Sequence, residues 1–452
     1  MREYYHLIHI HVEASYRLKL FQEHIPPFVG SNFVSSYIKA TQFPQKAKEW
    51  SIAGYQKYKA KIYRIPQMGR WHVIVTGDKL VDELRRQPDD ILSIAVAFDE
   101  TMQAKHMLGP TIMTNRYHVP IVRGQLTRHL GQLFADWTSI QAYPAVLQVV
   151  ARTSNRVFVG LPLCRDPEYT NLNIRHALEI ARGARILPYF PQILKPIAAK
   201  LLTNVPRSIH LAQKHLKPMI EERQRKIDEY GPDYTDKPAD FLSWLMDEAV
   251  GEERKPENLT NRILHINFAA IHTSSMSFTH ALFHLAAEPQ YLTPLREEVE
   301  SVIAEEGWTK AAMAPAINRT AVKDFTFSDG TKVTKGMMVS AASTPRHLDS
   351  DVYPSPEIFD GFRFSKIREQ DGQSTTNQLV ATNPDYIAFG HGSHACPGRF
   401  FVANEMKTMM AHLIMNYDIK MKNEGVRPAN IYEGFSCRPD ANAHVLFRKR
   451  QS

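Results

Sequence analysis

The chain has 452 residues, of which 43% are apolar and 23% are charged, a balance typical of globular proteins with a large buried core. Its formal net charge of +8 is spread along the chain without a run of basic residues, which excludes the basic arm of a nucleic-acid-binding protein. Dispersed solvated charge is the simplest explanation, and an anionic membrane surface or an acidic protein partner is the alternative. The three cysteines are odd in number and far apart, which argues against a disulfide framework or a Cys-x-x-Cys zinc site and favours a reducing compartment.

The N-terminal third is mixed in character. Residues 1–25 carry six charged side chains, so they form neither a membrane span, which needs about 20 mostly apolar residues, nor a secretory signal. The β-rich run Trp71–Thr76 predicts a strand that ends at the turn Gly77-Asp78. Apolar residues at helical spacing predict a helix over Ile121–Trp137.

Residues from about 170 to 310 are predicted to be largely helical. The longest helix is expected over Arg262–Ala287, opened by Asn258–Asn261. It is apolar on nearly every face, which is typical of a helix buried in the centre of a large protein. Three histidines and several hydroxyls interrupt it, so a bilayer is a poor environment for it.

The C-terminal third changes pattern. Two short strands are predicted around the turn Asp329-Gly330, followed by a proline-rich and aromatic-rich loop up to Phe364. A last helix is expected from Gly398 to about Tyr417, and then a terminal hairpin whose final strand is His444–Arg450. The fold class is therefore mainly α with a small β portion.

The segment from Phe389 to Phe401, FGHGSHACPGRFF, contains the most informative cysteine of the chain. Cys396 lies just before a predicted helix, where free N–H groups and the helix dipole stabilise a thiolate. Gly390 and Gly392 allow a tight turn and a close approach of the backbone to a flat ligand. Phe389 can limit the access of water to a metal–sulfur bond. The alternative is a buried structural cysteine in a glycine-rich turn.

The spacing Phe-x-x-Gly-x-x-x-Cys-x-Gly, formed by Phe389, Gly392, Cys396 and Gly398, resembles the signature of the cytochrome P-450 superfamily. The resemblance runs from about residue 60 to the end. The phrases FAAIHTSSMSFTHAL, DFTFSDGTKV and YPSPEIFDGFRF are most similar to fungal members that oxidise terpenoids or related secondary metabolites. The resemblance implies the cytochrome P-450 fold, with residues 26–452 as one catalytic domain. In this fold a long central helix lies over a haem, and a cysteine loop precedes a C-terminal helix.

The resemblance also implies a haem b cofactor with Cys396 as its axial iron ligand. Haem propionates need cationic partners, and the family positions that supply them correspond to His394, Arg123 and Arg319. Arg128 is an alternative to Arg123. A solvated surface charge is the alternative for either Arg123 or Arg319.

On the other side of the haem, Thr273 corresponds to the hydroxyl that helps deliver protons to bound oxygen, and His272 replaces the usual carboxylate and could relay protons near neutral pH. A threonine hydroxyl that bonds its own helix backbone is the alternative. Phe268, Ile271 and Phe435, in the loop 434–436, are candidates for the substrate pocket, with plain core packing as the alternative for such apolar residues.

The sequence departs from the family at one bracing pair. Arg363 corresponds to an arginine that normally pairs with a Glu-x-x-Arg helix turn, but no such turn occurs between Leu295 and Asn318. Glu222 and Arg225 have the right letters but lie a hundred residues too early, and we interpret them as part of an exposed charged helix. A helix missing near 311–317, from a faulty gene model, explains the gap better than divergence. Arg363 is then expected to have lost its partner. If it is truly buried, this loss destabilises the protein by about 3–5 kcal/mol, and haem retention is expected to be weaker than usual.

The resemblance predicts a monomeric monooxygenase that uses O2, an apolar small molecule and electrons from NADPH-cytochrome P-450 reductase, with no nucleic acid as partner. It predicts the cytosolic face of the endoplasmic reticulum membrane, although the usual membrane anchor is not visible in residues 1–25. A haem-thiolate isomerase or dehydratase and an inactive haem-binding product remain alternatives. A helical scaffold without haem is the most distant one.

Overall fold

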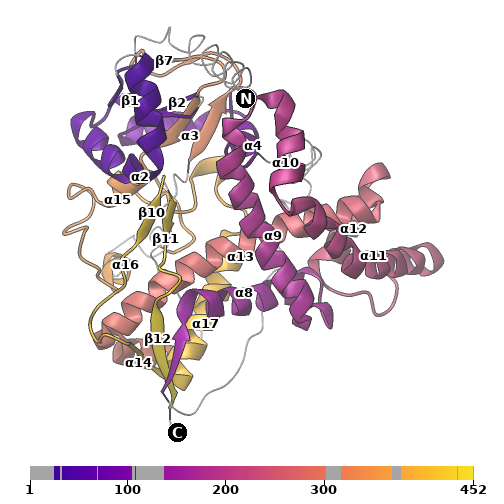
Figure 1. Cartoon of the computed structure of the whole chain (residues 1–452). Coiled ribbons are helices and arrows are strands. Elements are labelled where there is room, and N and C mark those ends of the chain that lie inside the picture. The colour runs from indigo at the N-terminus through magenta and orange to yellow at the C-terminus, as the bar shows by residue number, and fades with distance from the viewer. Residues whose placement is uncertain are drawn as a thin grey trace.

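The computed structural model describes residues 25–30, 33–68, 70–103, 107, 137–301, 317–368, 378–434 and 436–450. Within these ranges the chain is mainly helical with small sheets, as the sequence predicted (Figure 1). The predicted helix over Ile121–Trp137 lies outside the described residues except for Trp137. No helix in the described ranges combines the length and the apolar character that crossing a bilayer requires.

The largest sheet joins strands from residues 62–93 with strands from residues 318–341. Its strand order is β1-β2-β8-β5-β3, with β1 Ile62–Gln67, β2 Arg70–Val75, β8 Met338–Ala341, β5 Asn318–Ala321 and β3 Leu92–Ser93. The strand predicted at Trp71–Thr76 is confirmed as β2, which pairs with β8 in parallel from His72 opposite Met338. Helices α2 (Phe33–Lys57), α3 (Asp78–Arg86) and α4 (Ile94–Met102) lie around this sheet (Figure 1).

The helical body follows. It contains α8 (Ala142–Phe158), α9 (Pro167–Ile186), α10 (Lys195–Leu202), α11 (Val205–Tyr230), α12 (Phe241–Glu248), α13 (Pro256–Ala287) and α14 (Leu292–Ser301). Short 3-10 turns η2 (Leu187–Tyr189) and η3 (Gln192–Leu194) lead into α10. The start of α9 is encoded locally, because the Asp166 side chain accepts the N–H of Glu168 at 2.8 Å and Pro167 lies in the first turn.

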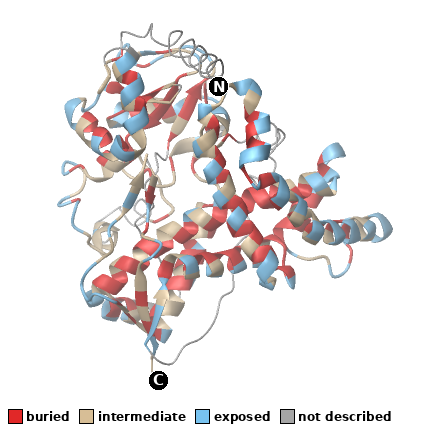
Figure 2. Ribbon diagram, in the orientation of Figure 1, coloured by how far each residue is buried: buried red, intermediate tan, exposed pale blue. Residues whose placement is uncertain are grey.

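Helix α13 runs through the centre of the molecule and packs against α8, α9, α11 and α17 (Figure 1). It begins six residues earlier than predicted, because Pro256 suits the first turn of a helix, where its missing N–H costs nothing. Most of its residues are buried, as expected (Figure 2). Ala269 and Thr273 are exposed, and at i and i+4 they lie on one face of the helix.

The C-terminal part surrounds the cysteine segment. It contains β6 (Phe325–Thr326), β7 (Lys332–Val333), α15 (Ser343–His347), α16 (Arg363–Arg368), α17 (Arg399–Asn416), β9 (Tyr417–Met421), β10 (Ile431–Glu433), β11 (Ser436–Arg438) and β12 (His444–Lys449). The strands predicted around Asp329-Gly330 are confirmed as β6 and β7, and the last helix is confirmed as α17.

The predicted terminal hairpin is wrong in its pairing. The final strand β12 lies between β9 and β4 (Thr138–Gln141) in a three-stranded sheet, whereas β10 and β11 pair with each other. Strand alternation in the sequence shows where a strand lies but not which partner it will find, and here one partner comes from a segment three hundred residues away.

Candidate active site

The loop formed by residues 389–398, called the Cys396 loop below, is closed by backbone hydrogen bonds. The N–H of Cys396 donates to the carbonyl of Phe389 at 2.7 Å, and that of Ala395 donates to the carbonyl of Gly392 at 3.1 Å, within the 3-10 turn η6 (Gly392–His394). Gly392 has a φ of +76°, and a Cβ there would lie 3.3 Å from the side chain of Arg85. The tight turn expected from the glycines is therefore present and suits a residue without a side chain.

The sulfur of Cys396 lies just before α17 and is only partly buried. Burial raises the pKa of the Cys396 thiol, while the backbone N–H groups of Gly398 and Arg399 and the Arg399 guanidinium lower it. The N–H groups at the helix start thus act in favour of the thiolate, as expected, but burial outweighs them and the net shift of the Cys396 pKa is upward. A metal cation at the sulfur would reverse the balance, since a coordinated thiol is deprotonated.

Arg399 is a residue that sequence reasoning missed. Its guanidinium donates to the carbonyls of Cys396 at 3.0 Å and Val380 at 3.1 Å, so it ties the end of the Cys396 loop to the preceding segment. The available signal was a basic residue directly after Cys-Pro-Gly, at the second position of the predicted helix.

The other two cysteines lie in different surroundings. Cys164 and Cys437 are buried, whereas Cys396 keeps part of its surface exposed. Cys437, in β11, lies 4.0 Å from Nε2 of His280, whose Nδ1 accepts a hydrogen bond from Arg427 at 3.0 Å. Cys164 also follows a glycine turn, at Gly160, and precedes α9, but its side chain is buried, and Cys437 lies in a strand. Cys396 is the only one of the three that combines such a turn with a partly exposed side chain, so it is the best suited to bind a metal.

The structure describes some, but not all, of the cationic residues that are expected near the propionates. His394 lies in η6 with Nε2 3.8 Å from the Asp89 carboxylate. Arg319 is buried in β5 and donates from Nη1 to the carbonyl of Asn318 at 2.8 Å. Arg123 and its alternative Arg128 lie outside the described residues. Binding of propionates by these side chains stays a prediction.

His272 and Thr273 occupy different faces of α13. The carbonyl of Ile174 accepts from Nε2 of His272 at 3.2 Å, so Nδ1 must accept from the Tyr143 hydroxyl, 3.1 Å away. Both ring nitrogens are thus occupied by α8 and α9, and burial lowers the pKa of His272. This geometry gives His272 a bridging position between helices and does not support its expected role as a proton relay beside Thr273.

Thr273 itself is exposed, and its hydroxyl donates to the carbonyl of Ala269 at 2.7 Å. The backbone-bonding alternative is therefore what the structure contains. The oxygen can still accept a hydrogen bond on the exposed side, because a hydroxyl has two lone pairs. Ala269, one turn earlier on the same face, was not singled out from the sequence, although its i, i+4 spacing from Thr273 was visible there.

The candidates for the substrate pocket also differ in how deeply they are buried. Ile271 is fully buried and packs with Leu147, Ala151 and Ile174, so its side chain is plain core and not pocket lining. Phe268 is partly buried against a cluster that includes Ile180 and Ala198, and it stays a candidate. Phe435 lies outside the described residues, between β10 and β11. The sequence could not separate Ile271 from Phe268, because both are apolar and the helix is apolar all round.

Arg363 differs from expectation in its surroundings. It is half-buried and donates to three backbone carbonyls, those of Pro354 at 2.5 Å, Ser355 at 3.0 Å and Ile358 at 2.9 Å. Among the described residues no carboxylate pairs with it. The destabilisation expected for a buried, unpaired Arg363 is therefore too large, because the carbonyls satisfy its donors and solvent reaches its charge.

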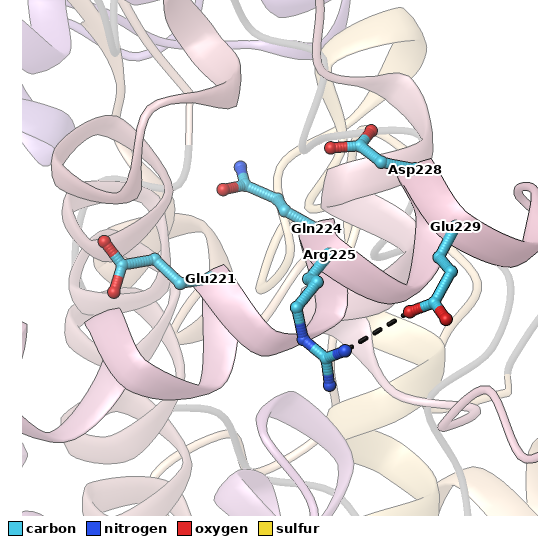
Figure 3. A pocket seen from close by; sticks show the side chains of 5 residues that line it. All are labelled: Glu221, Gln224, Arg225, Asp228 and Glu229. Atoms are coloured by element: carbon cyan, nitrogen blue, oxygen red, sulfur yellow. Dashed lines mark hydrogen bonds and ion pairs between the residues drawn. The ribbon is translucent and has the colours of Figure 1, made fainter.

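The early Glu-x-x-Arg sequence is confirmed as an exposed charged helix. Arg225 is 62% exposed and pairs with Glu222 at 2.8 Å and Glu229 at 3.2 Å on α11. Figure 3 shows the open pocket on this helix, which is lined by Glu221, Gln224, Arg225, Asp228 and Glu229. Its charged side chains are solvated and stand on α11, which projects from the body in Figure 1.

The residues present fit a haem. The Cys396 loop offers a sulfur that accepts two backbone N–H groups. The central helix α13 packs against α17, the helix that follows this loop, and exposes a face with the small side chain of Ala269. A flat ligand needs such a close backbone approach, and a thiolate ligand needs such a shielded loop.

Comparisons with known proteins agree with this geometry. The sequence model of the family described as cytochrome P450 matches residues 99–313 and 310–446. Cytochrome P450 monooxygenase 151 of Postia placenta is 40% identical, covering 95% of this chain and 94% of its own length. Cytochrome P450 monooxygenase CYP512U6 of Ganoderma lucidum is 32% identical, covering 94% of this chain and 92% of its own length. Cytochrome P450 monooxygenase olcJ of Penicillium canescens is 29% identical, covering 94% of this chain and 88% of its own length.

The family match covers well over half of the chain, and two of these relatives exceed 30% identity over nearly its whole length. The mainly helical structure with small sheets agrees with the fold of that family. The chain therefore belongs to the cytochrome P450 family, and it is a cytochrome P450 monooxygenase with the fold and the haem requirement of that family.

Proposed function

We propose that this monooxygenase binds haem b through Cys396 and oxidises an apolar small molecule, a terpenoid or a related secondary metabolite, with electrons from NADPH-cytochrome P-450 reductase. The observation that carries the proposal is the Cys396 loop, in which a partly buried sulfur is enclosed by hydrogen-bonded backbone just before α17. Haem with a thiolate ligand supplies reductive activation of O2 when it is bound.

The chain's own residues contribute binding and proton supply. The N–H groups of Gly398 and Arg399 lower the basicity of the sulfur and hold it in place. Thr273 offers an exposed hydroxyl oxygen on α13, suited to holding a water that delivers protons. His394 and Arg319 are the described cations proposed to face propionates.

The preference for an apolar substrate is supported by the exposed face of α13. Ala269 is small and apolar, and Phe268 lies partly buried beside it. Binding sites for small molecules are mostly apolar with a few polar groups, and Thr273 is such a group here. The relatives named above are fungal monooxygenases, in keeping with a fungal secondary metabolite as substrate.

A missing segment near residues 311–317 remains part of the proposal. The two family matches overlap at residues 310–313, within one residue of the expected gap. The alignment to the Postia placenta relative spans 469 positions, more than the 452 residues of this chain, so relatives contain residues without a counterpart here. We expect purified protein reconstituted with haemin to lose haem faster than a version in which the relative's segment is inserted, as measured by transfer to an excess of apomyoglobin. Equal loss rates would contradict this expectation.

We infer that the protein works at a membrane surface, on the cytosolic face of the endoplasmic reticulum. Ile193, Ile197 and Leu201 are 82%, 56% and 78% exposed at i, i+4 and i+8 along η3 and α10. Exposed Lys200 and Arg207 lie beside them in the sequence and would face anionic headgroups. An apolar helical face with flanking basic residues is suited to lying in a lipid interface.

The ligand assignment is tested by replacing single cysteines. Cys396→Ser should abolish the Soret band typical of a thiolate ligand in the reduced carbon-monoxide complex, because serine oxygen is a different ligand to iron. Cys164→Ser, a buried cysteine outside the site, should keep that band. A thiolate-type band that survives in Cys396→Ser would refute the assignment.

The reaction is tested with the reconstituted protein, the reductase, NADPH and a panel of terpenoids under isotopically labelled O2. One labelled oxygen atom in the product, together with NADPH consumption, is expected of a monooxygenase. Conversion without NADPH or O2 would instead indicate the isomerase or dehydratase alternative.

A further inference from the structure

The chain segment that enters the Cys396 loop is held from the side by three residues of one neighbouring region. Nε of Arg346, in α15, donates to the Asp385 carboxylate at 3.0 Å. Nε2 of His347 accepts the N–H of Ile387 at 3.3 Å, and the Tyr353 hydroxyl donates to the carbonyl of Asp385 at 3.1 Å. The segment is thus held through the Asp385 side chain and through the backbone of Asp385 and Ile387, a few residues before Phe389.

Arg346 is itself anchored on the opposite side. Its guanidinium pairs with Asp78 at the start of α3, and its Nη1 lies 3.4 Å from the Tyr55 hydroxyl of α2 and 3.8 Å from the Asp349 carboxylate. Tyr55 in turn donates to Asp349 at 2.6 Å. Burial acts to lower the pKa of Arg346, but Tyr55 and Asp385 outweigh it and raise the pKa, so the charge is permanent.

The connection from Arg346 to the cysteine is short. Ile387, two residues after Asp385, is fully buried in the core beside the largest sheet. The N–H of Gly390 donates to the carbonyl of Ile387 at 3.0 Å, and the carbonyl of Phe389 accepts the N–H of Cys396 at 2.7 Å. A shift of Asp385 would therefore be passed on to the backbone that closes the loop.

We propose that Arg346 is a positioning residue for the Cys396 loop: its ion pair with Asp385, anchored on Tyr55, Asp349 and Asp78, fixes the loop against α2 and α3. The Arg363 side chain, by contrast, donates its hydrogen bonds to the carbonyls of Pro354, Ser355 and Ile358, which lie outside this segment. The link to haem chemistry rests on the proposed ligand Cys396, whereas the bracing of the loop does not.

The first test is hydrogen exchange of the full-length chain, followed in peptides that cover residues 383–396. Arg346→Gln and Asp385→Asn should each raise exchange there by roughly tenfold, since a hydrogen bond to a charged group contributes about that much. The double variant should add little more, because both changes break the same pair. Arg225→Gln is the control: Arg225 pairs with two carboxylates of its own helix α11, and its replacement should leave these peptides unchanged.

Asp385→Asn keeps the test decisive if Arg346→Gln does not fold, because Asp385 is 45% exposed and its replacement removes only the pair. Unchanged exchange in residues 383–396, or an equal rise in peptides of α8 and α13, would overturn the proposal. Arg346→Lys, which keeps the charge, should restore part of the protection.

The second test measures the loop after reconstitution with haemin. At equal haem content, Arg346→Gln should lower the fraction of the reduced carbon-monoxide complex with the thiolate-type Soret band severalfold, and Arg346→Lys should recover part of it. An unchanged fraction would overturn the link between Arg346 and the ligand. If Cys396→Ser keeps the thiolate-type band, the ligand assignment fails while the exchange test still decides the role of Arg346.

Discussion

Adjacent residues of α13 differ in role because a helix turns by about 100° per residue. His272 faces inward and joins three helices through Tyr143 and the carbonyl of Ile174. Thr273 faces the exposed side, and among the described residues its hydroxyl bonds only within its own helix. The two residues are adjacent in the sequence, but their hydrogen-bond partners lie on different faces of α13, so a shared proton pathway stays a prediction.

The two positions are therefore expected to respond differently to substitution. His272→Leu should lower the free energy of unfolding by about 1–3 kcal/mol, because it leaves the Tyr143 hydroxyl and the Ile174 carbonyl without a partner. Thr273→Ala should change it by less than about 0.5 kcal/mol, because the side chain is exposed. Thermal unfolding of the two variants measures the difference, and a larger loss in Thr273→Ala would contradict it.

Thr273→Ala is expected to affect turnover instead. If its hydroxyl holds a proton-delivering water, the ratio of product formed to NADPH consumed should fall severalfold, while substrate binding should change little. His272→Leu, compared at a temperature at which both variants are folded, should keep the wild-type ratio. Equal ratios in Thr273→Ala and the wild type would contradict the proposed role of the hydroxyl.

At the scale of elements, α17 is joined to α8 by a buried carboxyl group. Oε1 of Glu405 accepts from the hydroxyls of Thr153 at 2.7 Å and Ser154 at 3.0 Å. Burial raises the pKa of Glu405 from 4.5 to about 7, against the two hydrogen bonds. The helix that follows the Cys396 loop is thus packed through a group that changes its charge near neutral pH.

The sign of the pH dependence follows from this shift. The folded protein holds the Glu405 proton more tightly than the unfolded chain, so the contribution to stability is fully present below about pH 4.5 and is lost as the pH rises through about 7. Glu405→Gln should remove this loss, which amounts to at most about 3 kcal/mol. Denaturation midpoints between pH 5 and 8 measure it, and an equal slope in Glu405→Gln and the wild type would contradict the shift.

At the scale of the whole molecule, one stretch of surface is unusually apolar. The residues around α10 expose large side chains in helical register, whereas the opposite face of the same helix packs into a core with Ala198 and Ala199. Apolar exposure of this kind is typical of a surface that contacts another phase.

Partition to lipid vesicles tests the membrane proposal. The double variant Ile193→Asp, Leu201→Asp should bind vesicles that contain anionic lipid at least about tenfold more weakly than the wild type, because burying each side chain contributes about 1.5–3 kcal/mol. Val250→Asp is the matched control, since Val250 is 73% exposed but lies between α12 and α13. Equal loss in the control, or no loss in the double variant, would contradict the proposal.

The sequence by itself determined the fold class, the position of Cys396 in a tight loop before a helix, and the existence of most elements, because these depend on local spacing and turn chemistry. It also separated the exposed Glu222–Arg225 pair from a bracing motif. Only the tertiary structure decided which face each residue of α13 presents, since a helix that is apolar all round carries no directional signal.

The pairing of β12 with β4 and β9, the bridging role of His272 and the position of Arg346 beside Asp385 join residues from distant parts of the chain. Such contacts depend on how packed elements meet in space, which one sequence does not encode in any local pattern. The balance of pKa contributions at Cys396 belongs to the same class, because burial is a property of the folded chain.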